Sequence, residues 1–164
     1  MAAPQLDFGS AQQIAPDVAE IGVMLMAVQA ARNPSVKAGK LSIALVTSGV
    51  EWLKAASDRA VVVFPLVLTV SSTNDAGEVA EMAKLSLQYH IIYVFRQPLQ
   101  LSDAELESFL AYYGCIHIWP YARAEFQQLS VKIDLPPIIL PVLRNGVLPS
   151  GFTITQLTPD ELTS

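Results

Sequence analysis

The sequence has only one cysteine and no cluster of basic residues. These two features exclude a disulfide-stabilised protein and make a nucleic-acid-binding protein an unexpected class. Of its 164 residues only Cys115 is a cysteine, so an intramolecular disulfide is impossible and a reducing, cytoplasmic location is expected. Ten Lys and Arg against fifteen Asp and Glu give a net charge of −5. Without a basic patch to neutralise phosphates, nucleic acid is excluded as an expected partner.

The sequence also lacks a long apolar run and a secretion signal. Its most apolar stretch, residues 61–70, is well short of the roughly eighteen residues that a membrane helix needs. The first thirteen residues have no cationic start followed by an apolar segment. We therefore expect no direct membrane insertion.

Motifs for catalysis and for metal binding are missing as well. Neither His90 nor His117 has a Cys or a second His at metal-ligand spacing. No GxSxG, HExxH or glycine-rich phosphate loop occurs. Asp103, Glu105 and Glu107 crowd the start of an expected helix, where the helix dipole accounts for acidic residues. We expect no enzyme, no cofactor and no metal.

Apolar residues are what the sequence has in excess. They make up 52% of it, while charged residues make up only 15%, against about 25% in typical soluble domains. A single soluble chain of this size would struggle to bury so much apolar surface. The composition therefore predicts self-association, an exposed apolar surface with a use, or both.

The first half of the sequence predicts strands. Residues 1–13 are expected to form a flexible leader, and residues 14–31 fit either a helix or a strand, with 21–29 favoured as a strand. Further strands are predicted at 41–52, 61–71 and 79–95, with a hairpin turn at 73–77. Pro65 requires a bulge or an unpaired side in the second of these strands, and the third is long enough to need a bend or bulge.

The second half predicts helices, which gives an α+β plan. Ser102 and Glu105 have the spacing of a capping box, and Gly114 is the expected C-cap of that helix. Pro120 is placed in the first turn of a second, amphipathic helix that ends before Pro136.

Residues 115–143 carry a resemblance to a known family. Trp119-Pro120-Tyr121-Ala122-Arg123, followed by Asp134-Leu135-Pro136-Pro137 and Ile139-Leu140-Pro141-Val142-Leu143, resembles the SecB family of export chaperones. The DLPP form is most similar to the SecB-like chaperones of toxin–antitoxin systems. LQYH at 87–90 and the SDAELESFL helix stand in the same order as in that branch. The resemblance covers roughly residues 60–143.

The resemblance implies a fold and a function. The fold would be a four-stranded antiparallel sheet followed by a long helix, with residues 14–146 as the SecB-like domain and 147–164 as a C-terminal tail. The assembly would be a homotetramer, a dimer of dimers with its helices between two sheets. The function would be ATP-independent holding of unfolded or precursor polypeptides in apolar grooves, for delivery to SecA or for control of an antitoxin.

The resemblance and the apolar pattern together suggest three groups of site residues. Client binding is assigned to apolar strand and tail residues: Val63, Val67, Leu87, Tyr89, Ile91, Tyr93, Ile138 and Leu140. The oligomer interface or helix core is assigned to Trp119, Pro120, Tyr121, Arg123, Phe126 and Leu129. The acidic surface that would face SecA is assigned to Asp75, Glu78 and Glu81. Tyr89, Ile91 and Tyr93, with Phe95, also fit a sheet–helix core, and a core role is expected for at least half of these four.

Two other classes of function fit the same pattern. A hot-dog-type acyl-thioester enzyme also wraps a sheet around a long helix, and Glu125 would be its catalytic carboxylate. A structural oligomer without a client is the other alternative.

Overall fold

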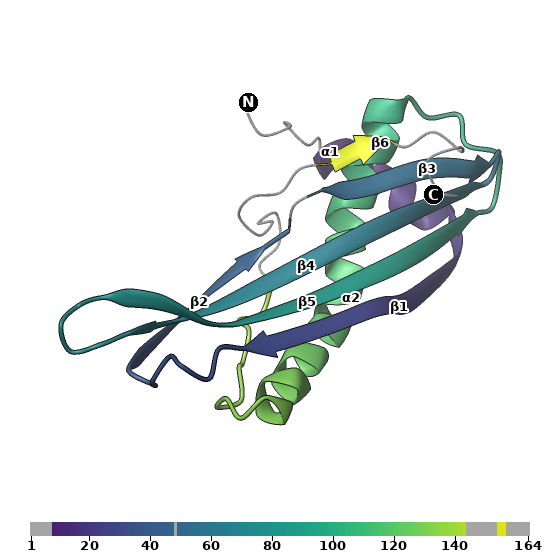
Figure 1. The fold of residues 1–164 in the computed structure, drawn as a ribbon. Helices are drawn as coiled ribbons and strands as arrows, with labels where there is room; N and C mark the ends of the chain where they lie inside the picture. Colours follow the sequence, from purple (N-terminus) through teal and green to yellow (C-terminus); the bar gives the residue numbers. More distant parts are fainter. Residues whose placement is uncertain (1–7, 48, 144–153, 157–164) are drawn as a thin grey trace.

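The computed structural model describes residues 8–47, 49–143 and 154–156 (Figure 1). In chain order the elements are α1 (Phe8–Ile14), a 3₁₀ helix (Ala15–Asp17), β1 (Val18–Arg32), β2 (Lys40–Val46), β3 (Val50–Ala56), β4 (Arg59–Thr73), β5 (Val79–Phe95), α2 (Asp103–Lys132) and β6 (Ile154–Gln156). The strands form one sheet in the order β1-β5-β4-β3-β6, with β2 also paired to β4. The predicted α+β class is confirmed, with β1, β5, β4 and the β2–β3 edge as its four antiparallel positions.

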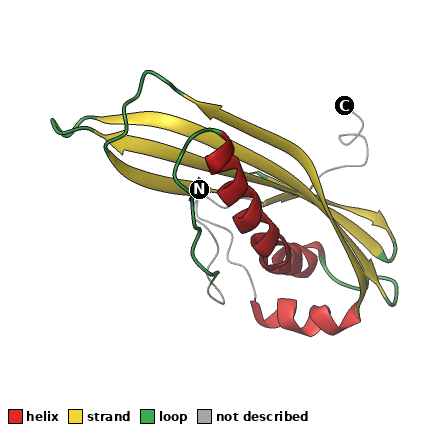
Figure 2. Cartoon of the chain, turned by 90° about the horizontal axis from the view of Figure 1, so that it is seen from below, coloured by secondary structure: helices red, strands yellow, loops and turns green. Residues whose placement is uncertain are grey.

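Both helices lie on the same face of the sheet (Figure 2). The core forms between α2 and the alternate residues of β4 and β5 that point toward it, among them Phe64, Leu66 and Leu85, all fully buried. No described helix covers the opposite face, which we call the bare face of the sheet.

The prediction of a single strand at 41–52 is wrong. The structure has two strands there, β2 ending at Val46 and β3 beginning at Val50. Both pair with the same side of β4, β2 ending at Val46 opposite Val67 and β3 pairing Glu51 with Val63. Pro65 lies between those two partners, at the gap. A proline has no N–H for a ladder, so the break stands where β4 could not have paired fully. The predicted unpaired side at Pro65 is confirmed.

The strand predicted at 79–95 has those same bounds in the structure, and it carries the expected bulge. Ser71 pairs with Glu81 whereas Val70 pairs with Ala83, which leaves Met82 as the extra residue. Met82 is buried beside Ala83 although simple alternation places it on the other face. The undecided residues 14–31 are mostly strand β1, which contains a similar bulge at Met26.

The prediction of two helices is wrong, because α2 is one helix of 30 residues. Its capping box is present: Glu105 N–H donates to Ser102 Oγ, and Ser102 N–H donates to Glu105 Oε2 at 2.9 Å. Gly114 lies inside the helix and is needed there for packing, since a Cβ at this position would stand 2.7 Å from Phe64 Cε2. Pro120 also lies within the helix, with its side chain exposed to solvent. The helix continues through it and loses one backbone hydrogen bond, because proline has no N–H.

The predicted leader is partly structured. Residues 8–13 belong to α1, which packs on α2 and buries Ala11 and Ile14 in the core. Residues 1–7 lie outside the described residues. Of the predicted tail 147–164 only β6 is described, and it pairs in parallel with β3. None of the described helices is both long and apolar enough to cross a membrane.

Candidate functional site

β1 presents an apolar surface on both of its faces. Within the described part of the chain it pairs only with β5, so its other edge is open. Its fifteen residues include only two charged ones, Glu20 and Arg32. The exposed large side chains are Ile21, Met24, Leu25, Met26 and Val28. No site residue was predicted here, although apolar residues on both faces of a strand would have been the signal.

The bare face of the sheet is also largely apolar. Val63 and Val67, both predicted to bind clients, lie on this face of β4, and His90 lies between Val63 and Met24 in register. Val67 is half-buried, as are three more apolar residues of this face, Val61, Ile92 and Val94. Burial lowers the pKa of His90. The apolar part of this face is therefore formed by Val61, Val63, Ile92 and Val94, whereas Val67 lies at its border, opposite Ser86.

The other four predicted strand residues, Leu87, Tyr89, Ile91 and Tyr93, are core. They are at most 2% exposed on the face that packs on α2. The rings of Tyr93 and of Phe109 in α2 pack edge to face, with their centroids 5.2 Å apart. The Tyr93 hydroxyl forms a hydrogen bond of 2.8 Å with His117 Nδ1. A polypeptide does not reach these side chains while α2 covers them.

Residues 135–143 form an extended segment that runs back along α2, and we call it the strap. Arg123 Nε donates to the Leu140 carbonyl and Trp119 Nε1 donates to the Pro141 carbonyl, each at 3.0 Å. At its start, Ile138 N–H donates to Ser130 Oγ at 3.1 Å. The predicted client residues Ile138 and Leu140 both lie in the strap, at 8% and 2% exposure.

The predicted interface residues of α2 divide into three groups. Trp119, Phe126 and Leu129 are buried, Arg123 is half-buried and holds the strap, and Pro120 and Tyr121 are exposed. Sequence spacing alone did not separate them, because it does not show that the strap, which follows α2 in the chain, folds back onto one side of the helix.

The predicted acidic residues lie at the tip of the β4–β5 hairpin. Asp75, Glu78 and Glu81 are exposed. Asn74 organises the turn, accepting at its Oδ1 from the N–H groups of Ala76 and Glu78 and donating from Nδ2 to Glu78 Oε2. The tip is therefore an ordered acidic projection.

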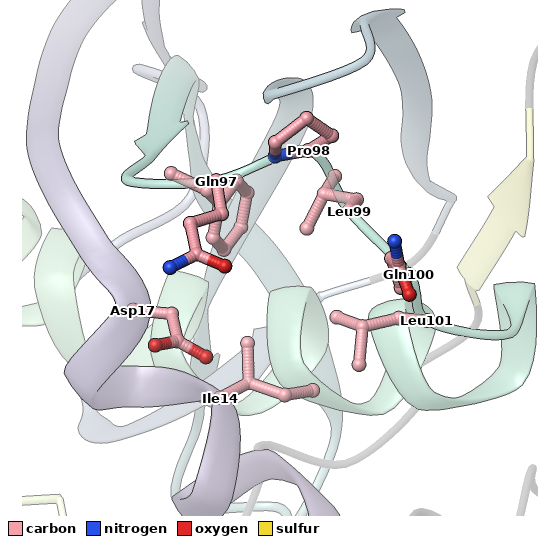
Figure 3. A pocket seen from close by; sticks show the side chains of 8 residues that line it. Ile14, Asp17, Gln97, Pro98, Leu99, Gln100 and Leu101 are labelled. Carbon is pink, nitrogen blue, oxygen red and sulfur yellow. The ribbon is translucent and has the colours of Figure 1, made fainter.

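A small cleft lies where the 3₁₀ helix meets the loop before α2 (Figure 3). Its volume is about 220 Å³, below the roughly 300–1,000 Å³ of small-molecule sites. Its lining is Ile14, Asp17, Phe95, Gln97, Pro98, Leu99, Gln100 and Leu101. The cleft is therefore smaller than a typical substrate site, and Asp17, Gln97 and Gln100 make its lining partly polar.

Among the described residues, the titratable groups show neither a metal-binding cluster nor a reactive thiol. No group of three or more His, Cys, Asp or Glu there could hold a metal. Cys115 is buried, and burial raises the pKa of its thiol to about 12. Glu125, the carboxylate of the thioester alternative, is half-buried near Tyr89, whose pKa burial and this charge raise to about 12. Glu125 does not line the cleft.

Comparison with solved structures gives an informative match. No protein-family profile and no curated protein matches the sequence. Among solved structures, the fold is similar to the SecB-like chaperone Rv1957 of Mycobacterium tuberculosis, in complex with a ChAD peptide from the HigA1 antitoxin. The two chains are 20% identical with a TM-score of 0.68, over 85% of this chain and 99% of the other.

A second solved structure is much less similar. It is a protein of unknown function from Streptococcus agalactiae, 11% identical over 76% of this chain and all of the other, with a TM-score of 0.30. That similarity is too low to indicate a related fold or function. The first match extends over the sheet and the long helix, and it shows that this chain has the fold of a SecB-like chaperone.

Proposed function

We propose that this protein is an ATP-independent chaperone that holds non-native polypeptides, with antitoxins as one class of client. The observation that carries the proposal is the bare, largely apolar face of the sheet in a chain with a SecB-like fold. The structure of the M. tuberculosis protein with an antitoxin peptide supports the client class. Each 100 Å² of apolar surface covered by a client would contribute about 2.5 kcal/mol of burial free energy, which the entropy lost by the bound client partly offsets.

The proposal is tested by aggregation of an unfolded protein without nucleotide. The intact protein should suppress light scattering by chemically denatured client on dilution. Val67→Glu replaces a half-buried apolar side chain of the bare face by a charged one and should weaken client binding by about tenfold. Thr69→Glu, two residues along the same face of β4, is the matched control and should change affinity less. Failure of the intact protein to suppress scattering would refute the holding function.

A homotetramer is the second part of the proposal. The open edge of β1 suits pairing with β1 of a second copy, which would remove the unprotected edge strand. The exposed Pro120 and Tyr121, with Val131 on the same outer side of α2, suit contact between two such dimers. Light scattering after gel filtration should give a tetramer for the intact protein and dimers for Tyr121→Asp. A monomeric intact protein would contradict this assembly.

Delivery is proposed toward an antitoxin rather than toward SecA. The hairpin tip with Asp75, Glu78 and Glu81 stays the predicted SecA surface. Replacing all three by lysine should leave binding of an antitoxin C-terminal peptide unchanged, measured by fluorescence anisotropy. Loss of SecA binding in the same variant, when the parent binds SecA, would instead assign the protein to export.

A further inference from the structure

The strap is a short extended segment bound to the surface of α2. Its side chains alternate between the helix and solvent only over residues 138–140: Ile138 and Leu140 are 8% and 2% exposed, whereas Ile139 between them is 70% exposed. Pro136, Pro137 and Pro141 have no N–H to donate, which prevents a regular ladder. The segment therefore packs on the rest of the protein through three buried side chains, those of Leu135, Ile138 and Leu140.

The side-chain hydrogen bonds from α2 to the strap all involve main-chain atoms of the strap. Trp119 Nε1 and Arg123 Nε donate to main-chain carbonyls, and Ser130 Oγ accepts from the Ile138 N–H. Neither carbonyl depends on the identity of the side chain at that position. Any extended segment with apolar residues at alternate positions offers the same groups.

The strap is attached mainly through side chains rather than through backbone pairing. Leu135 N–H donates to the Ser130 carbonyl at 2.9 Å. Beyond it, no backbone–backbone hydrogen bond joins residues 136–143 to other described residues. The remaining attachment is three side-chain hydrogen bonds and the inserted side chains, all of which a second extended segment could replace one for one.

We propose that the strap occupies a polypeptide-binding site on α2, and that an extended apolar segment of a client displaces it. This inference rests on the proposed chaperone function and adds to it. The strap occupies the donors of Trp119 and Arg123 when no client is bound, and its sequence LPPIILPVL shows the chemistry the site accepts. Trp119 and Arg123 would then bind client carbonyls.

Accessibility of a cysteine placed in the strap tests displacement directly. Leu140→Cys places a thiol against α2, and Ile139→Cys places one in solvent on the same segment. The native Cys115 is buried and reacts little, so the parent provides the background. Saturation with reduced, carboxamidomethylated pancreatic trypsin inhibitor should raise alkylation of Leu140→Cys about tenfold and leave Ile139→Cys unchanged or slower. No increase at Leu140→Cys, with client bound, overturns the inference.

Client affinity gives an independent measurement. Leu140→Ser and Ile138→Ser weaken the strap but leave Trp119 and Arg123 in place, so fluorescein-labelled client should bind each about tenfold more tightly. Ile139→Ser removes an equally apolar side chain that does not face α2, and it should keep the parent affinity. A strap that merely forms a wall for clients would give weaker binding in Ile139→Ser and no gain in Leu140→Ser, which would contradict displacement.

The two proposals fail in different ways. If the parent binds no client, the chaperone function fails. If the parent binds client while both strap variants bind it no more tightly, only displacement fails. Thermal unfolding of each variant identifies any that does not fold, and the cysteine experiment then decides.

Discussion

Gly114 shows at the residue scale how close the helix approaches the sheet. Its missing Cβ would stand 2.7 Å from Phe64 Cε2, nearer than real Cβ contacts allow. We expect Gly114→Ala to lower the free energy of unfolding by about 1–3 kcal/mol through overpacking, despite the higher helix propensity of alanine, worth about 1 kcal/mol. Urea unfolding measures it. Gly22→Ala is the control, because its Cβ would meet only Ile92 Cβ at 3.9 Å. Equal or greater stability of Gly114→Ala would contradict the predicted clash.

Cys115 permits a second test of a single residue. Burial raises the pKa of its thiol to about 12, so at pH 8 only about one molecule in 10,000 carries the reactive thiolate. We expect a disulfide reagent to react with the folded protein far more slowly than with the protein in urea. The absorbance of the released thiol measures both rates. Comparable rates in the two states would show that Cys115 is accessible.

At the scale of elements, the start of α2 is determined by two neighbouring residues that form a capping box. Ser102 caps the helix and Glu105 closes the capping box. Ser102→Ala removes the side chain that accepts the Glu105 N–H, and it should cost about 1 kcal/mol of stability in urea unfolding. Ser42→Ala, at an exposed position of β2, should change stability by no more than a few tenths of that. An unchanged midpoint for Ser102→Ala would mean that water replaces the cap.

The elements differ in how much of them the sequence predicts. β5 was predicted with its observed bounds, since polar and apolar residues alternate along most of it. α2 was divided wrongly, because Gly114 and Pro120 are local signals of helix ends that tertiary packing overrides. The capping box, by contrast, depends only on neighbours in sequence and was predicted.

The candidate site was less predictable than the fold, for a reason of the same kind. Alternation distinguishes the two faces of a strand but does not say which face a helix will cover. Tyr89 and Tyr93 were therefore assigned to clients, although α2 covers them. The strap contacts join Arg123 to a carbonyl 17 residues away, and no local pattern encodes that pairing.

At the scale of the whole molecule, stability should depend on pH through the partly buried histidines. Burial lowers the pKa of His90 and of His117 in the folded state. A base whose pKa is lowered by folding binds more protons when unfolded, so stability is highest above the unfolded value of about 6.5 and falls as the pH drops below it. Urea unfolding at pH 7.5 and pH 5.5 should show lower stability at the acidic pH.

A variant separates the histidine contribution from that of the carboxyl groups. Burial raises the pKa of Glu107, and this contribution has the opposite sign because protonation of Glu107 at low pH favours the folded state. His117→Gln should therefore reduce the loss of stability between the two pH values, relative to the parent. An identical loss in parent and variant would show that His117 does not contribute.

The position of β1 in the sheet also determines what happens while the chain is being made. β1 precedes the other described strands in the sequence, yet its partner is β5, and Val18 pairs with Phe95, 77 residues later. At about 5–20 residues per second, a ribosome takes roughly 4–15 s to supply that partner. During this time fifteen mostly apolar residues have no strand to pair with. The nascent protein thus passes through a stage in which it has the same chemistry as the polypeptides it is proposed to hold.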